Sequence, residues 1–121
     1  MIKGGVASIY VTDMKRSVEF YQSVLGLTLR NQVGDDWAEL QAGPGLILGL
    51  HIARPPETVA AGTAGAINVE LHVAGTMEDA VSILANRGAA IEGEIANYEH
   101  VRIAMLRDPD GNSILLAEVL G

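Results

Sequence analysis

Alternation of apolar and polar residues is the clearest pattern in this chain. It is strict over residues 67–73, as expected for a β-strand with one buried face. A β-prone run over residues 6–11 predicts another strand near the N-terminus. Further apolar runs, which are bounded by turn-forming Gly, Pro or Asp residues, predict the remaining strands. These runs cover residues 27–33, 37–41, 46–52, 90–97, 101–107 and 113–119.

Two stretches have the 3.6-residue period of an amphipathic helix. The first begins after Asp13, a residue type that caps helices, and ends before Gly26, so that its apolar face comprises Met14, Val18, Tyr21 and Leu25. The second begins after Thr76 and ends before Gly88, and its apolar face comprises Met77, Ala80, Val81 and Leu84.

The order of one strand, one helix and three strands therefore occurs twice. Positions 62 residues apart correspond, so that Ile9 matches Leu71. Neither half is large enough to hold a core alone, and both are expected to pack together in a single domain over residues 1–121. The predicted class is α+β, with a first βαβββ module at 5–53, a linker containing two adjacent prolines at 54–65 and a second module at 66–119.

Composition and charge argue against several classes of partner. No apolar run reaches the roughly 18 residues expected of a membrane span, so no membrane partner is predicted. The net charge of −7 would repel the phosphates of nucleic acid. The absence of cysteine excludes disulfides and thiolate metal sites. Residues 1–5 lack the apolar stretch of a signal peptide, so we expect a cytoplasmic protein.

Two motifs resemble one known superfamily. The stretch 11–27 ends its predicted helix with Phe20-Tyr21 and Val24-Leu25-Gly26-Leu27, and residues 107–112 read Arg-Asp-Pro-Asp-Gly-Asn. Together with the duplicated βαβββ pattern, they resemble the vicinal-oxygen-chelate superfamily, which contains glyoxalase I, bleomycin- and fosfomycin-resistance proteins and extradiol dioxygenases. The resemblance implies two modules that form an open, eight-stranded, barrel-like cleft for a small molecule, often completed in a homodimer.

The same resemblance implies where a metal would be held. Catalytic members place metal ligands at positions that correspond here to Val6, Gly49, Asn68 and Leu115. A zinc or iron site needs about three side chains of suitable chemistry, and these four positions offer only one weak ligand, the Asn68 amide. We therefore predict no metal at the usual site and no cofactor. Gly49, where relatives carry a carboxylate, is expected to leave additional room in the cleft.

Strand parity predicts which side chains line the cleft, because residues two apart share a face. Flat aromatic side chains supply stacking area, and a few polar groups add specificity. The predicted ligand-binding residues are Tyr10, Trp37, Glu39, Gly49, His51, Asn68, Glu70, His72 and Leu115.

Glu70 and His72 are the candidate catalytic pair. Two residues apart on one strand, they start roughly 7 Å apart and could act as an acid and a base. Alternatively, both lie at the solvated rim of the sheet and only make that face hydrophilic. His51 could join them in a displaced His-His-Glu metal site.

Three functions remain open at this point. The first is metal-independent binding of a small molecule, such as sequestration of a toxic or cationic organic compound, and a cationic ligand would suit the net charge of −7. The second is a lyase, isomerase or dioxygenase that uses His51, Glu70 and His72. The third is an interaction module that dimerises or senses a metabolite. The sequence does not decide whether a reaction is catalysed.

Overall fold

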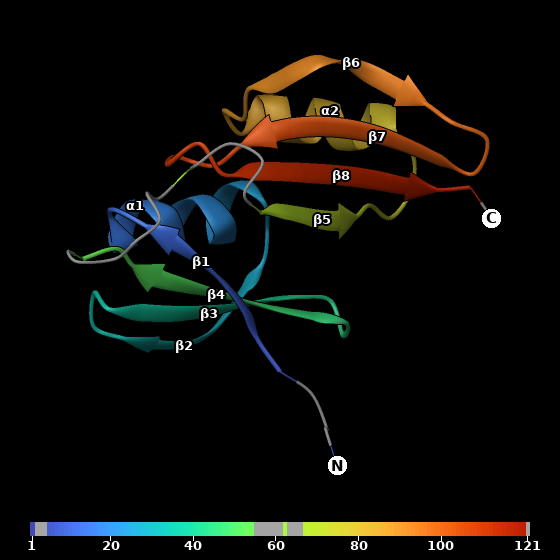
Figure 1. Cartoon of the computed structure of the whole chain (residues 1–121). Coiled ribbons are helices and arrows are strands. Elements are labelled where there is room, and N and C mark those ends of the chain that lie inside the picture. The colour runs from blue at the N-terminus through green and yellow to red at the C-terminus, as the bar shows by residue number, and fades with distance from the viewer. Residues whose placement is uncertain (2–4, 55–61, 63–66, 121) are drawn as a thin grey trace.

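Two four-stranded sheets, each with helices packed against it, make up the computed structural model (Figure 1). The structure describes residues 1, 5–54, 62 and 67–120, so most of the predicted linker at 54–65 lies outside the described residues. The first half contains β1 (Ala7–Val11), α1 (Met14–Glu19), the π-helical turn η1 (Phe20–Val24), β2 (Thr28–Val33), β3 (Trp37–Ala42) and β4 (Leu46–Ile52). The second contains β5 (Asn68–His72), α2 (Met77–Asn86), β6 (Ile91–Asn97), β7 (Val101–Arg107) and β8 (Ser113–Val119).

The strand order confirms the predicted duplication. Sheet one runs β1-β4-β3-β2 and sheet two runs β5-β8-β7-β6. In each sheet the first and last strands of the half pair in parallel, and the remaining pairs are antiparallel. The fold is thus the predicted pair of βαβββ modules, and the two sheets do not join into a closed barrel.

The first predicted helix differs from expectation in its last turn. Asp13 caps α1 by accepting from the backbone N–H of Arg16 at 3.1 Å, as its residue type suggests. From Phe20 onward the turns widen, and the N–H of Leu25 bonds to the carbonyl of Phe20, five residues earlier. The predicted helix therefore consists of a short α-helix and a π-helical turn, which end at Gly26 with a positive φ of 76°.

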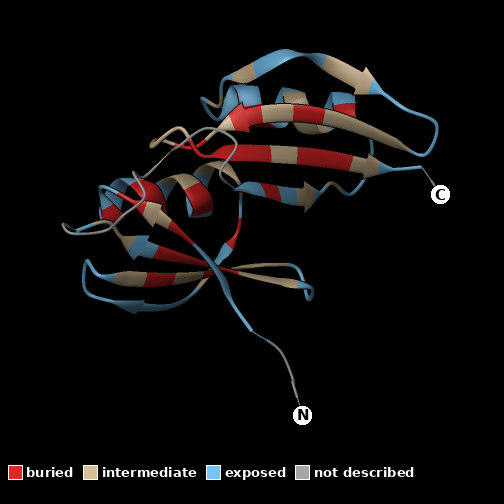
Figure 2. Ribbon diagram, in the orientation of Figure 1, coloured by how far each residue is buried: buried red, intermediate tan, exposed pale blue. Residues whose placement is uncertain are grey.

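Each sheet buries the face that carries a helix. On sheet one, α1 packs against β3 and β4, and on sheet two α2 packs against β6, β7 and β8. Figure 2 shows buried positions along β4, β7 and β8 and largely exposed β2 and β6 at the outer edges. The helix-facing core of the two sheets comprises Ile9, Ala38, Leu40, Leu48, Leu50, Val69, Ala104, Leu106, Ile114 and Leu116. The opposite face of each sheet carries the predicted binding residues.

The turn between β7 and β8, Asp108–Asn112, joins the two modules, and we call it the inter-module turn. Asp108 is only 5% exposed, and its carboxylate accepts from the Tyr21 hydroxyl at 2.8 Å. The same carboxylate accepts from the backbone N–H of Asp110 and from both the backbone N–H and the side-chain amide of Asn112, at 2.8–3.0 Å. One carboxylate thus shapes the turn and holds the helical segment of the other module.

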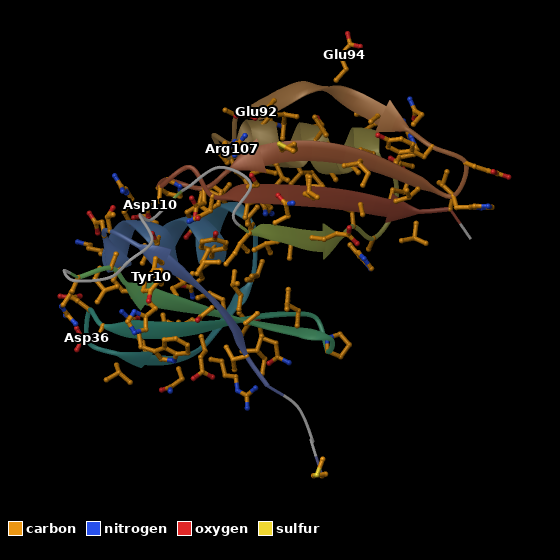
Figure 3. The ribbon with its side chains drawn as sticks, in the orientation of Figure 1. Tyr10, Asp36, Glu92, Glu94, Arg107 and Asp110 are labelled. Carbon is orange, nitrogen blue, oxygen red and sulfur yellow. The ribbon has the colours of Figure 1, made fainter. Side chains whose placement is uncertain are left out.

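Asp110, in the same turn, binds the start of α1. Its side chain is 4% exposed and accepts from the backbone N–H of Thr12 at 3.2 Å and from the Thr12 hydroxyl. Ser17 donates to it at 3.4 Å, and the Arg16 guanidinium lies 3.6 Å away. Figure 3 shows Asp110 beside α1. The sequence correctly predicted a turn here, but not its contacts with the first module.

A second polar cluster holds α2 on its sheet. Glu118 of β8 accepts from the backbone N–H of Met77, the first residue of α2, at 2.9 Å. Arg102 of β7 donates to Glu118 at 3.1 Å and also pairs with Glu78. The hydrogen bonds from Arg102 lower the pKa of Glu78 below its ordinary value.

Among the described residues, no helix has the length and apolar composition needed to cross a membrane.

Replacing Asp108 by Ala is expected to lower the free energy of unfolding by about 3 kcal/mol, because buried donors of Tyr21 and Asn112 lose their acceptor. Chemical denaturation measures the change. Asp36→Ala is the control, since Asp36 forms an exposed pair with Arg54 and its loss is expected to cost about 0.5 kcal/mol. Equal losses in the two variants would contradict the proposed importance of the turn.

Stability is also expected to fall at alkaline pH because of Tyr21. Burial, and then the negative charge of Asp108, raise the pKa of Tyr21 above its ordinary value of about 10. Above about pH 10 the unfolded chain releases this proton and the folded chain keeps it, so stability decreases as pH rises. Denaturation curves between about pH 8 and pH 11 should show a smaller decrease for Tyr21→Phe than for the native chain. Identical pH dependence would exclude Tyr21 as the cause.

Candidate functional site

Sheet one gathers three rings on its helix-free face. Strand register sets His51 of β4 beside Tyr10 of β1 on one side and beside Trp37 of β3 on the other. The His51 ring meets Tyr10 edge to face at a centroid distance of 5.3 Å and Trp37 at 6.1 Å. His51 is exposed, and both aromatic side chains are half-buried. The structure therefore brings these three predicted residues together as an aromatic surface open to solvent.

Trp37 is held in place from two directions. Its indole Nε1–H donates to Glu39, two residues along the same strand, at 2.9 Å. Its six-membered ring covers Gly49, and a Cβ added at Gly49 would lie 2.4 Å from the nearest ring carbon. The expectation that Gly49 leaves room in the cleft is therefore wrong at this point. The space above the glycine is filled by Trp37, and glycine permits the indole to lie against the sheet.

Sheet two carries the other predicted residues. Glu70 lies beside Leu115 in the register of β5 and β8, and Asn68 lies beside Ser113. The His72 Nε2 and a Glu70 carboxylate oxygen are 2.8 Å apart, with the two side chains 65% and 49% exposed. A carboxylate in this position orients the imidazole and leaves its other nitrogen for proton transfer. The pair is therefore formed, although in an exposed position.

Sequence analysis missed Arg107 on the same face. Register places it beside Ser113, which it contacts at 2.7 Å, and it pairs with Glu92 of β6 at 3.1 Å (Figure 3). Met105, beside Leu115, belongs to this face as well. Both could have been identified from the predicted strand 101–107, because residues two apart in a strand share a face and Met105 and Arg107 are two apart.

The candidate residues consequently form two groups on two sheets. The helix α1 occupies the other face of sheet one, on the side where the second module lies (Figure 1). Among the described residues, no ring contact or hydrogen bond links Tyr10, Trp37 or His51 to Glu70 or His72. Within that part of the chain, no three His, Asp or Glu side chains cluster closely enough to hold a metal ion. One chain does not assemble the displaced site of His51, Glu70 and His72.

The positions where the resemblance would place metal ligands do not provide such a cluster either. These positions are Val6, Gly49, Asn68 and Leu115. Val6 lies just before β1 and is exposed, and the Trp37 ring covers Gly49. The donors at these positions do not fit a zinc or iron centre.

A separate hollow lies between the modules, with a volume of about 950 Å³. Of the predicted residues, only Glu70 and His72 line it. Its other walls come from the β3–β4 turn, the segment after η1, and α2.

Solved structures share this fold over nearly the whole chain. TnmS3, an antibiotic binding protein from Streptomyces sp. CB03234, is 28% identical, with a TM-score of 0.76 and 98% coverage of both chains. A glyoxalase/bleomycin resistance protein from the same Streptomyces strain is 27% identical, with a TM-score of 0.76 and coverage of 96% of this chain and 100% of its own. A glyoxalase/bleomycin resistance protein/dioxygenase from Nocardioides is 24% identical and has a TM-score of 0.72, which shows the fold alone, and it covers 99% of this chain and 86% of its own.

No curated protein matches this sequence. The family pattern, in contrast, matches residues 5–116, which include the first βαβββ module, all of the second except the end of β8, and both motifs that carried the resemblance. The chain therefore belongs to the Glyoxalase/Bleomycin resistance protein/Dioxygenase superfamily.

Proposed function

We propose that this protein binds a small organic molecule on the helix-free face of sheet one, without a metal. The observation that carries the proposal is the aromatic surface of Tyr10, Trp37 and His51, with the indole fixed by Glu39 and Gly49. A fixed, half-buried indole offers stacking area at little cost in conformational entropy. The 28% identity to TnmS3, named as an antibiotic binding protein, supports a role in sequestering a toxic compound.

The chemistry of this face favours a flat, cationic ligand. Glu39 places a carboxylate beside the rings, and one of its oxygens accepts from Trp37. Aromatic faces and carboxylates both attract cations, and the net charge of −7 steers cations toward the protein. On sheet two, in contrast, His72 lies against Glu70 and Arg107 pairs with Glu92. Glu39 is therefore the acidic group that we assign to ligand recognition.

We further propose that a second copy of the chain completes the site in the cytoplasm. The candidate groups lie on separate sheets, and each lies on a face that α1 or α2 leaves uncovered. Packing sheet two of one copy over sheet one of another would add Asn68, Leu115 and Met105 to the rings of the first. Such a homodimer would enclose the ligand between the aromatic wall of one copy and the wall that sheet two of the other copy provides, whose apolar part is Leu115 and Met105.

A second candidate function is an enzyme that transfers protons. The 2.8 Å contact between His72 and Glu70 favours it, because a carboxylate-oriented imidazole is a common general base. The two functions differ in what happens to the ligand. A binding protein leaves it unchanged, whereas an enzyme that transfers protons isomerises or cleaves it.

Replacing Trp37 by Ala should weaken binding of the planar cation acridine orange at least about tenfold, since stacking and desolvation are lost. Glu39→Gln should reduce the preference for acridine orange over the planar anion anthracene-9-carboxylate. Calorimetric titration measures both affinities. Tyr98→Ala is the control, because Tyr98 is an exposed aromatic residue outside this face. Unchanged affinity in a folded Trp37→Ala protein would contradict the proposed site.

Mass spectrometry of the bound molecule after incubation separates the two functions. Recovery of unchanged ligand agrees with sequestration, whereas a new mass that disappears in the His72→Gln variant would establish the enzyme.

Sedimentation equilibrium should give twice the 12.7 kDa mass of one chain. Leu115→Asp should shift the protein to the monomer, because it places an unpaired charge in the apolar wall of the proposed interface. Glu94→Lys on the exposed strand β6 is the control and should leave the dimer intact. A monomer at every concentration would contradict completion by a second copy.

A further inference from the structure

The hollow between the modules, which we call the inter-module groove, lies away from the aromatic surface. One wall is Leu25–Thr28 and the turn 41–46 of the first module. The other wall is residues 70–74 and the face of α2 that carries Asp79, Ala80, Ile83, Leu84 and Arg87. Its volume of about 950 Å³ is suitable for a small organic molecule.

The duplication of the fold explains why this groove exists. The β7–β8 turn begins where Arg107 pairs with Ser113, and the β3–β4 turn begins where Gln41 pairs with Ile47. Both connections have the same length, so their residues correspond one to one. The β7–β8 turn contacts α1 of the first module, and the β3–β4 turn faces α2 of the second module. The groove lies between the β3–β4 turn and α2, in the place where hydrogen bonds join the β7–β8 turn to α1.

The two turns have opposite chemistry at corresponding positions. Ala42 stands in the place of Asp108, Pro44 in that of Asp110, and Leu46 in that of Asn112. None of the three can make the side-chain hydrogen bonds of its counterpart.

The facing helices differ in the same way. Counted from the helix caps Asp13 and Thr76, which lie 63 residues apart, Leu84 of α2 corresponds to Tyr21, which donates to Asp108. At the strand spacing of 62 residues, Ala74 corresponds to Thr12, which donates to Asp110. In one half polar side chains fill the space between turn and helix, and in the other half aliphatic side chains leave it open.

The charged groups at the groove have polar contacts of their own or lie exposed to solvent. Glu70 lies against His72, and Arg87 donates to the carbonyl of Val24 at 3.0 Å. Asp79 stands in the first turn of α2, where the helix dipole stabilises a negative charge. Asp79 and Arg87 are exposed, so solvent screens their charges, and a charged ligand would lose hydration for little electrostatic gain. The described residues that line the groove include no Phe, Tyr or Trp, and the apolar ones are Leu25, Leu27, Ala42, Pro44, Leu46, Leu71, Val73, Ala74, Ala80, Ile83, Leu84 and Leu116.

We propose that the inter-module groove is a second binding site, which takes an uncharged aliphatic molecule. Burial of an aliphatic chain against the leucines and Ile83 supplies the binding free energy. Ile83 is 49% exposed, and such a ligand would cover it. The groove is separate from the proposed cation-binding site, because it uses none of Tyr10, Trp37, Glu39 or His51, although Glu70 and His72 line it.

The probe for this site is 1-octanol, compared with octanoate and octylammonium, which have the same chain length and opposite charges. Titrations followed by amide chemical shifts should show saturable binding of 1-octanol, with shifts confined to residues of the groove. Both ions should bind at least about tenfold more weakly. Trp37 is the only tryptophan of the chain, so its fluorescence reports on the aromatic surface and should not change with 1-octanol.

Ile83→Asp places a charge in the groove and should lower the affinity for 1-octanol at least about tenfold. Ala85→Asp adds the same charge to an exposed position of α2 that does not line the groove, and it should bind as the native chain does. The double variant Ala42→Asp with Leu84→Tyr introduces the counterparts of Asp108 and Tyr21 at the corresponding positions, and it should lower the affinity for 1-octanol at least about tenfold.

Several results would overturn the proposal. They are a linear, unsaturable response to 1-octanol, equal weakening by Ile83→Asp and Ala85→Asp, tighter binding of either ion, or a change in Trp37 fluorescence. A fall in molecular mass when 1-octanol binds would also overturn it, since a second copy would then occupy the groove.

Discussion

The buried carboxylate of Asp108 is the interaction on which the arrangement of the two modules depends. It accepts four hydrogen bonds, three from its own turn and one from Tyr21 in the other module. A carboxylate with only 5% exposure is costly unless its lone pairs are satisfied, and here donors on both modules satisfy them. The position of α1 relative to sheet two, and with it the direction in which sheet one faces, follows from this contact.

The duplication gives two equivalent junctions between a turn and a helix, but only the junction of the β7–β8 turn with α1 contains this contact. A polar turn fills the space beside α1, whereas an aliphatic turn of equal length leaves the inter-module groove beside α2. Gene duplication supplies two equivalent backbones, and the side chains decide whether each junction is closed. The aromatic surface shows the same principle, because Gly49 allows Trp37 to lie flat on a strand where relatives are expected to carry a carboxylate.

Several details were available from the sequence because they are local. Alternation predicted the strands within one or two residues, and Asp13 and Thr76 cap the helices as their residue types indicate. Parity placed Tyr10, Trp37 and His51 on one face, and Glu70 beside His72. Arg107 was missed although the same parity applied to it. The π-helical turn at Phe20 escaped prediction because its apolar positions fit an α-helical period equally well.

By itself, the sequence determined the two βαβββ modules, the caps and turns, and which residues share a sheet face, since each depends on neighbours a few positions away. Only the tertiary structure decided the rest. It buried Asp108 against a tyrosine 87 residues distant, placed the Trp37 ring over Gly49, and separated His51 from Glu70 and His72 onto different sheets. These outcomes depend on how two sheets and their helices pack. The spacing of residues along the chain does not determine how far apart they lie once the sheets have packed.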